Sequence, residues 1–262
     1  MNLLEAIILG IVQGLTEFLP VSSSGHLELG KSLLGINEGG VLFSVVLHGA
    51  TALSTIVVFW KEIVSLAKGV FKFKWNEEFR YVLIIVFSMI PVGIVGVFFE
   101  EEVEAFFTGN IRFVGVMLLV TAALLFVTER VKVQSGSKVS FRNAMIIGLA
   151  QAVAILPGIS RSGATISTAL LLKIDRTNAA RFSFLMVIPP ILGANLLSVL
   201  KITNGEAVVE NISTLALTAG FISAFLVGFL ACKWMIRIVK NSKLYLFSIY
   251  CVIIGSLAII LG

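Results

Sequence analysis

The sequence predicts an all-α polytopic membrane protein with six transmembrane helices plus two re-entrant helix hairpins in an inverted-topology repeat. The first observation behind this fold class is composition, because 58% of the 262 residues are hydrophobic and 13% are charged. A soluble domain is usually about half apolar and about a quarter charged. The second observation is a set of six apolar stretches, each close to the roughly 20 residues that a helix needs to cross a bilayer. The third is a pair of further apolar stretches that proline, glycine and serine interrupt.

The six predicted spans are separate apolar runs bounded by charged or polar segments. They cover residues 41–60, 81–99, 112–129, 180–200, 213–232 and 244–261. The two interrupted stretches are different, since Pro20 and three serines follow residues 3–19, and Pro157 and the sequence GISRSG follow residues 143–156. Non-helical backbone at membrane depth is tolerated only where it is buried in protein or lines a wet cavity. We therefore expect both turns to be enclosed by the protein.

Loop charge predicts the orientation of the spans. The basic loops are 61–80, 130–142 and 233–243, and the acidic ones are 100–111 and 201–212. Basic loops lie on the cytoplasmic side of a membrane. All five loops obey this rule only if each interrupted stretch enters the membrane and leaves it by the same face. We predict one re-entrant hairpin at 3–35, entered from outside, and one at 143–173, entered from the cytoplasm.

The two halves of this single membrane domain also resemble each other in sequence. A shift of 138 positions aligns five residues of the first hairpin with identical residues of the second. The matched pairs are Gly10 and Gly148, Gln13 and Gln151, Ser22 and Ser160, Ser24 and Ser162, and Gly25 and Gly163. We expect one repeat in residues 1–130 and a second, inverted repeat in residues 141–262. Such an architecture places its binding site at the repeat interface, near the middle of the membrane; chance similarity of two serine-rich turns is the alternative.

Both turns carry polar side chains that are costly at membrane depth. The first turn holds Gln13, Glu17, Ser22, Ser23, Ser24 and His26, and the second holds Gln151, Ser160, Arg161, Ser162 and Thr165. A helix should begin after each turn, and unpaired amide groups make a helix N-terminus an anion site. The fork of Arg161 fits a phosphate in a bidentate way. The pattern therefore indicates a ligand that carries phosphate.

Each of these residues also has a purely structural interpretation. Glu17 could pair with Arg161 as a structural bridge, His26 could be a satisfied packing histidine, and the serines could cap helices. Ionisable groups inside a membrane are nevertheless rare and usually functional. Because Glu17, the serines and His26 lie together, we favour a catalytic role for this cluster.

The two turns resemble the signature motifs of a known family, the undecaprenyl-pyrophosphate phosphatases or bacitracin-resistance membrane phosphatases. The motifs here are QGLTEFLPVSSSGH at 13–26 and LPGISRSGAT at 156–165, and the likeness extends over essentially the whole chain. The resemblance implies a hydrolase that removes one phosphate from undecaprenyl pyrophosphate and so recycles the lipid carrier of cell-wall synthesis. It also implies a site in the bacterial cytoplasmic membrane that opens to the outer face. The chain departs from the family pattern at Gln13, where the first acidic residue of an E-x-x-x-E pattern is expected, and this weakens any mechanism that needs two carboxylates.

From the motifs and this resemblance we expect two groups of site residues. The catalytic group is Glu17, Ser23, His26 and Arg161, and the substrate-binding group is Gln13, Ser22, Ser24, Gln151, Ser160, Ser162 and Thr165. Ser23 is the preferred nucleophile, with Ser22 or water as alternatives, and either Glu17 or His26 could be the general base.

The expected partners are a polyprenyl diphosphate lipid and the bilayer. Nucleic acid is not expected, because the basic residues lie in short loops between apolar runs. No cofactor is assigned with certainty; Mg²⁺ or Ca²⁺ bound with the diphosphate stays open, as does a homodimer. A polyprenyl-phosphate flippase or transporter is the rival function, because broken helices in inverted repeats are typical of transporters.

Overall fold

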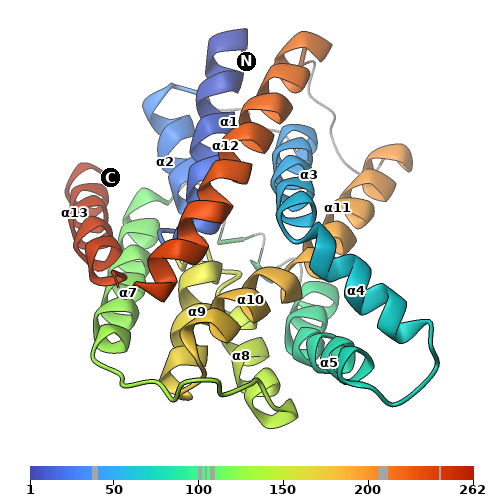
Figure 1. The fold of residues 1–262 in the computed structure, drawn as a ribbon. Coiled ribbons are helices and arrows are strands. Elements are labelled where there is room, and N and C mark those ends of the chain that lie inside the picture. The colour runs from blue at the N-terminus through green and yellow to red at the C-terminus, as the bar shows by residue number, and fades with distance from the viewer. Residues whose placement is uncertain (37–40, 100–101, 104, 107–109, 206–211, 242) are drawn as a thin grey trace.

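A computed structural model describes residues 1–36, 41–99, 102–103, 105–106, 110–205, 212–241 and 243–262, and over these residues the chain is helical with connecting turns (Figure 1). The helices that build the fold are α1 (Leu3–Phe18), α2 (Ser23–Leu33), α3 (Val41–Val58), α4 (Trp60–Val70), α5 (Glu77–Phe98), α7 (Ile111–Glu129), α8 (Phe141–Val153), α9 (Arg161–Leu171), α10 (Arg176–Met186), α11 (Ile188–Thr203), α12 (Thr214–Lys240) and α13 (Tyr245–Leu261). Parts of the predicted acidic loops 100–111 and 201–212 lie outside the described residues.

The chain is a multi-pass membrane protein, because several of its helices are long and apolar enough to cross a bilayer. Four described segments are long and apolar enough to cross a membrane: α5, α7, the α10–α11 segment Arg176–Thr203, and α12. The bent pair formed by α3 and α4 raises the number to five if it counts as one span, and α13 is a shorter apolar helix. Each predicted span therefore falls on an apolar helix or helix pair.

Two segments that we predicted as basic loops are largely helical. Residues 61–80 contain most of α4 and the first turn of α5, and residues 233–243 contain the last two turns of α12. α4 is amphipathic, because Leu66 is buried whereas Lys61 and Lys68 are exposed. It meets the preceding helix at 76°, so the predicted span 41–60 ends at a sharp bend. The charge pattern correctly marks polar surface, but polar surface is compatible with a helix as well as with a loop.

Four helix pairs form the main packing contacts of the fold. α1 and α3 both pack along α12, α8 packs along α5, and α7 packs along α13 (Figure 1). Glycine permits three of these approaches, because no Cβ would fit where Gly10 of α1 faces Gly220 of α12 or where Gly148 of α8 faces Ser88 of α5. Gly115 of α7 and Gly255 of α13 face each other in the same way. Small residues at such crossings let membrane helices come into backbone contact.

The two interrupted stretches form helix–turn–helix units, as predicted. α1 ends at Phe18, and its C-cap Leu19 is extended, which is the conformation that a following proline imposes. α2 then begins at Ser23 with Ser22 as its N-cap, and α9 begins at Arg161 with Ser160 as its N-cap. The start of α2 lies against the turn 154–160, where Gly25 meets Gly158, and the start of α9 lies against the turn 19–22, where Gly163 meets Pro20.

Candidate functional site

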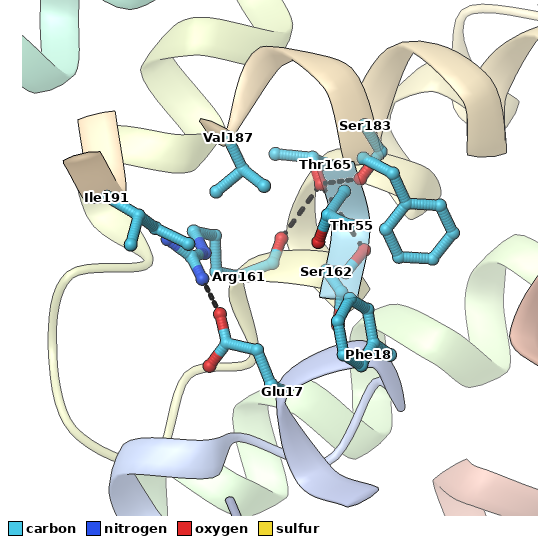
Figure 2. Close-up of a pocket in the computed structure, with 10 residues that line it drawn as sticks. Glu17, Phe18, Thr55, Arg161, Ser162, Thr165, Ser183, Val187 and Ile191 are labelled. Atoms are coloured by element: carbon cyan, nitrogen blue, oxygen red, sulfur yellow. Dashed lines mark hydrogen bonds and ion pairs between the residues drawn. The ribbon is translucent and has the colours of Figure 1, made fainter. Parts of the chain in front are cut away.

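An ion pair between Glu17 and Arg161 joins the two interrupted stretches. Glu17 lies in the last turn of α1, and Arg161 is the first residue of α9, 144 positions later in the chain. The Arg161 guanidinium donates to Oε1 of Glu17 (Figure 2). The Glu17 side chain is almost fully buried, with 4% of its surface exposed, whereas 28% of the Arg161 side chain is exposed. The pairing that we considered as a structural bridge is therefore present. It brings the predicted catalytic carboxylate of Glu17 into contact with Arg161, the predicted phosphate-binding residue.

The second oxygen of Glu17 accepts from Ser23 and Gln13. The Ser23 hydroxyl donates to Glu17 Oε2 at 2.7 Å, and Gln13 Nε2 donates to the same oxygen at 3.0 Å. Gln13 and Glu17 are four residues apart and share one face of α1, as the spacing predicts. A serine hydroxyl that donates to a buried carboxylate has the geometry of a nucleophile beside its general base.

Ser22 connects the two turns. Its Oγ accepts from Gly25 N at 3.3 Å and from Gly158 N at 3.2 Å. Its backbone lies at φ 69°, a left-handed conformation that is uncommon for a residue with a side chain. Because its Oγ already accepts two backbone amides, Ser22 is placed as a cap and cross-link between the turns, whereas Ser23 faces the carboxylate.

The turns pack against each other without intervening side chains. A Cβ on Gly25 would lie 3.1 Å from Gly158 Cα, and a Cβ on Gly163 would lie 3.2 Å from the Pro20 side chain. The Ser162 hydroxyl donates to Leu19 O at 3.1 Å. Small residues at these positions allow the starts of α2 and α9 to converge on one region.

The second turn repeats the capping arrangement of the first. Ser160 Oγ accepts from Gly163 N at 3.0 Å and lies 3.2 Å from Ser162 Oγ, much as Ser22 Oγ lies 3.3 Å from Ser24 Oγ. The Thr121 hydroxyl on α7 accepts a hydrogen bond from the Ser160 amide at 3.1 Å and donates one to Gly158 O at 3.1 Å. This network fixes hydroxyl groups around the N-terminus of α9, where an anion would be favoured.

Thr165 connects the first turn of α9 to α10. Its hydroxyl donates to Arg161 O at 2.9 Å and lies 2.6 Å from Ser183 Oγ on α10 (Figure 2). Ser183 belongs to the "RFSFLM" segment, and nothing in its local sequence indicates a role in the site. Its position follows from the packing of α10 against α9.

His26 is held by two partners, neither of which is Glu17. Its Nδ1 lies 2.8 Å from Ser22 O, and its Nε2 lies 2.8 Å from the hydroxyl of Tyr250. The Tyr250 and His26 rings stack with centroids 5.6 Å apart and planes 14° apart. Since a carbonyl oxygen can only accept, Nδ1 carries the hydrogen, and in the neutral ring Nε2 accepts from Tyr250. No sequence pattern indicated a role for Tyr250, because a tyrosine in an apolar span is ordinary.

Gln151 does not join this cluster by any hydrogen bond. It is 1% exposed, and its Nε2 and Oε1 both lack a hydrogen-bond partner among the described residues. Gln13 also keeps one free atom, its Oε1. The ten other predicted site residues are connected through hydrogen bonds and the ion pair around the two turns.

The cavity beside the ion pair is small. Its volume is about 10 Å³. The polar residues that line it are Glu17, Thr55, Arg161, Ser162, Thr165 and Ser183 (Figure 2). That volume is close to the minimum for one water molecule, about 10–15 Å³. A larger anion could bind Arg161 only if Glu17 moved away from it.

The donor set offers little to a metal ion by itself. No group of three or more His, Cys, Asp or Glu side chains able to hold a metal occurs among the described residues. Around Glu17, the other oxygen donors are the amide Oε1 of Gln13 and the serine hydroxyls. Hard divalent cations prefer several oxygen ligands, so one carboxylate would hold such an ion only together with phosphate oxygens.

Comparison with known proteins gives one family and many relatives. The family described as "Bacitracin resistance protein BacA" matches residues 6–257. A protein named undecaprenyl-diphosphatase from Christiangramia forsetii is 57% identical over 264 residues, which cover 99% of this chain and 98% of that protein. Proteins of the same name from Bacteroides thetaiotaomicron and Methanosphaera stadtmanae are 57% and 41% identical, and each alignment covers at least 99% of both chains.

Proposed function

The chain belongs to the bacitracin resistance protein BacA family, and we propose that it is a membrane phosphatase that hydrolyses undecaprenyl pyrophosphate to undecaprenyl phosphate and inorganic phosphate. The relatives that cover the whole chain carry the name undecaprenyl-diphosphatase. The observation that carries the proposal is the contact of Ser23 with Glu17 at 2.7 Å, next to Arg161. A carrier needs anion-binding groups but no nucleophile paired with a base, so this contact favours hydrolysis over the flippase or transporter alternative.

In the first step the terminal phosphate of the substrate takes the place of Glu17 at Arg161. The guanidinium and the amide groups at the start of α9 bind the phosphate oxygens. Ser160 and Ser162 add hydroxyl donors when their O–H groups turn from Ser162 Oγ and Leu19 O toward the phosphate. These groups neutralise the charge that spreads over the equatorial oxygens in the transition state. Glu17 loses its cationic partner in this exchange and keeps its contact with Ser23.

Glu17 then acts as the general base. It takes the proton of the Ser23 hydroxyl while the oxygen attacks the terminal phosphorus. The bond from that phosphorus to the bridging oxygen breaks, and undecaprenyl phosphate leaves with the bridging oxygen. Water next attacks the phosphorus of the phosphoserine and the bond from that phosphorus to the Ser23 oxygen breaks. Glu17 returns its proton to the Ser23 oxygen, and the phosphate leaves as inorganic phosphate with the oxygen and protons of the water. The contact at 2.7 Å between Ser23 and Glu17 supports Glu17 in this role, because His26 faces Ser22 and Tyr250 instead.

Direct attack by water is the second route within the same function. A divalent cation such as Mg²⁺ or Ca²⁺ would bind here with the diphosphate, with Glu17 and Gln13 Oε1 as the nearest protein ligands. It would supply charge neutralisation on the diphosphate oxygens. Phosphate release with and without a chelator tests this requirement.

We propose that the chain has six transmembrane helices and two re-entrant hairpins, with repeats at 1–130 and 141–262. α2 and α9 have 11 residues each, about half the length of a span, and both begin at the position that the offset of 138 predicts, since 161 − 23 = 138. The first helix of each half also packs on the other half: α1 on α12 and α8 on α5. This exchange is the arrangement expected of two inverted repeats.

We place the protein in the bacterial cytoplasmic membrane, with the site open to the outer face. In a background in which Cys232 and Cys251 are changed to Ala, a cysteine at exposed Glu102 should react with an impermeant thiol reagent added outside intact cells. A cysteine at Lys243 should react only after the membrane is opened. Labelling of both from outside would contradict this orientation.

The function is tested by phosphate release from a prenyl diphosphate with the purified protein. Ser23→Ala should lose at least about 100-fold in kcat, because the nucleophile is removed. Ser32→Ala, an exposed serine farther along α2, is the matched control and should keep its activity. A Ser23→Ala protein with normal turnover would exclude the covalent route, and wild-type protein that binds the lipid without releasing phosphate would favour a carrier.

A further inference from the structure

A groove distinct from the cavity at Arg161 lies between the end of α1, the last turns of α12 and the beginning of α13. Its volume is about 710 Å³, and most of its lining is apolar. Leu15, Leu19 and Val21 line it on the side of α1, and Ile238 and Phe247 line it on α12 and α13. A groove of this kind suits hydrocarbon chains.

One end of the groove is basic and polar. Arg237, Asn241 and Lys243 line it where α12 ends and α13 is about to begin. All three are exposed, and neither the Arg237 nor the Lys243 side chain forms an ion pair with any described residue. Trp234, which is 51% exposed, also lines the groove one turn before Arg237. Lysine, arginine and tryptophan together are typical of the level at which membrane helices meet lipid headgroups.

We propose that this groove binds an anionic phospholipid. The lipid phosphate lies between Arg237 and Lys243, and the acyl chains follow the apolar walls toward Val21 and Tyr250. The charge of the groove end and the apolar character of the remainder match the two parts of such a lipid. The lipid comes from the leaflet on the side of residues 237–243, which is the cytoplasmic one in the orientation proposed above.

The prenyl chain of the substrate fits the same groove less well. With its diphosphate at Arg161, a prenyl chain in the groove would run from Tyr250 toward residues 237–243. Its hydrocarbon end would then lie beside two cationic side chains, where it would strip them of water without pairing them. The polarity of the groove therefore favours a lipid whose headgroup lies at that end.

The test measures lipid binding to the purified full-length protein after delipidation in detergent. Native mass spectrometry at low salt gives the affinities for phosphatidylglycerol and for phosphatidylcholine with the same acyl chains. We expect phosphatidylglycerol to bind at least tenfold more tightly. The double change Arg237→Gln with Lys243→Gln should lower the affinity for phosphatidylglycerol by about 30-fold, and each single change should lower it by about fivefold. The affinity for phosphatidylcholine should not change.

The matched control removes two lysines that are exposed but lie outside the groove. Lys72→Gln with Lys74→Gln makes the same change in net charge and should alter the affinity by less than twofold. If the double groove variant does not fold, the single variants and the preference for phosphatidylglycerol in the wild-type protein decide the question.

Three results would overturn the proposal: equal affinity for the two lipids, unchanged affinity of the groove variants, or the same loss in the control. Displacement of phosphatidylglycerol by a prenyl diphosphate would also overturn it, because the groove would then hold the substrate chain. The binding measurement needs no catalysis, so its outcome is independent of whether the protein hydrolyses the diphosphate.

Discussion

The Tyr250 hydroxyl lies 2.8 Å from His26 Nε2, although 224 residues separate the two in sequence. With Ser22 O on Nδ1, this contact fixes the His26 ring in both orientation and tautomer. The imidazole is thereby held beside the turn that carries Ser23, the proposed nucleophile, by a residue of the last helix. We therefore expect Tyr250 to be a positioning residue that acts through His26.

Removing the Tyr250 hydroxyl should lower turnover and leave substrate binding nearly intact. In Tyr250→Phe the stacked ring remains, but Nε2 loses its donor, so we expect kcat to fall about tenfold with KM changed less than twofold. Steady-state phosphate release gives both constants. Tyr245→Phe, on the first turn of α13, is the control and should behave as wild type. A rise in KM without loss of kcat would show that Tyr250 contacts substrate and does not act through His26.

Changing Ser22 should affect folding more than chemistry. Ser22→Ala removes the acceptor for Gly25 N and Gly158 N, and a lost buried hydrogen bond costs about 1–3 kcal/mol. We expect a lower thermal midpoint in detergent, with kcat of the folded protein reduced less than tenfold. Ser24→Ala removes one serine of the same turn without breaking a cross-link and should lower the midpoint less. If Ser22→Ala retains full stability and loses all turnover, Ser22 is the nucleophile.

The shape of the Arg161 side chain should matter as well as its charge. Arg161→Lys keeps a cation but loses the planar fork that binds phosphate in a bidentate way, so we expect kcat/KM to fall about 100-fold. Arg181→Lys is a matched control, because Arg181 also pairs with a glutamate, Glu62, outside the cluster. Unchanged kcat/KM in Arg161→Lys would mean that Arg161 only bridges to Glu17.

The two glutamines at equivalent positions should respond differently to the same change. Gln151 buries an amide that has no hydrogen-bond partner within the described part of the chain, and such burial costs about 1–3 kcal/mol. Gln151→Leu should therefore raise the thermal midpoint and keep activity. Gln13→Leu removes a donor to Glu17 and should lower kcat by about tenfold. Thermal unfolding and phosphate release on both variants test this. A Gln151→Leu protein with impaired kcat/KM would support the sequence-based prediction that Gln151 binds substrate.

The sequence allowed the helices to be predicted for identifiable reasons, and it located the two turns whose side chains meet in the structure. Apolar runs located the spans, and Pro20 with the serine run located the end of α1 and the start of α2. The prediction was weaker where polarity has two explanations, because the basic segments 61–80 and 233–243 are predicted as loops and are largely helical. Gln151 is predicted in the site beside its equivalent Gln13, and among the described residues no hydrogen bond connects it there.

By itself the sequence determined the membrane class, the two interrupted stretches and the kinds of side chain that they carry, since these depend on local composition and on short spacings. Only the tertiary structure decided which of these side chains meet. The ion pair of Glu17 with Arg161, the cross-link from Ser22 to Gly158 and the contact of His26 with Tyr250 each join distant parts of the chain. Such contacts depend on how whole helices pack, and no pattern within one segment specifies that.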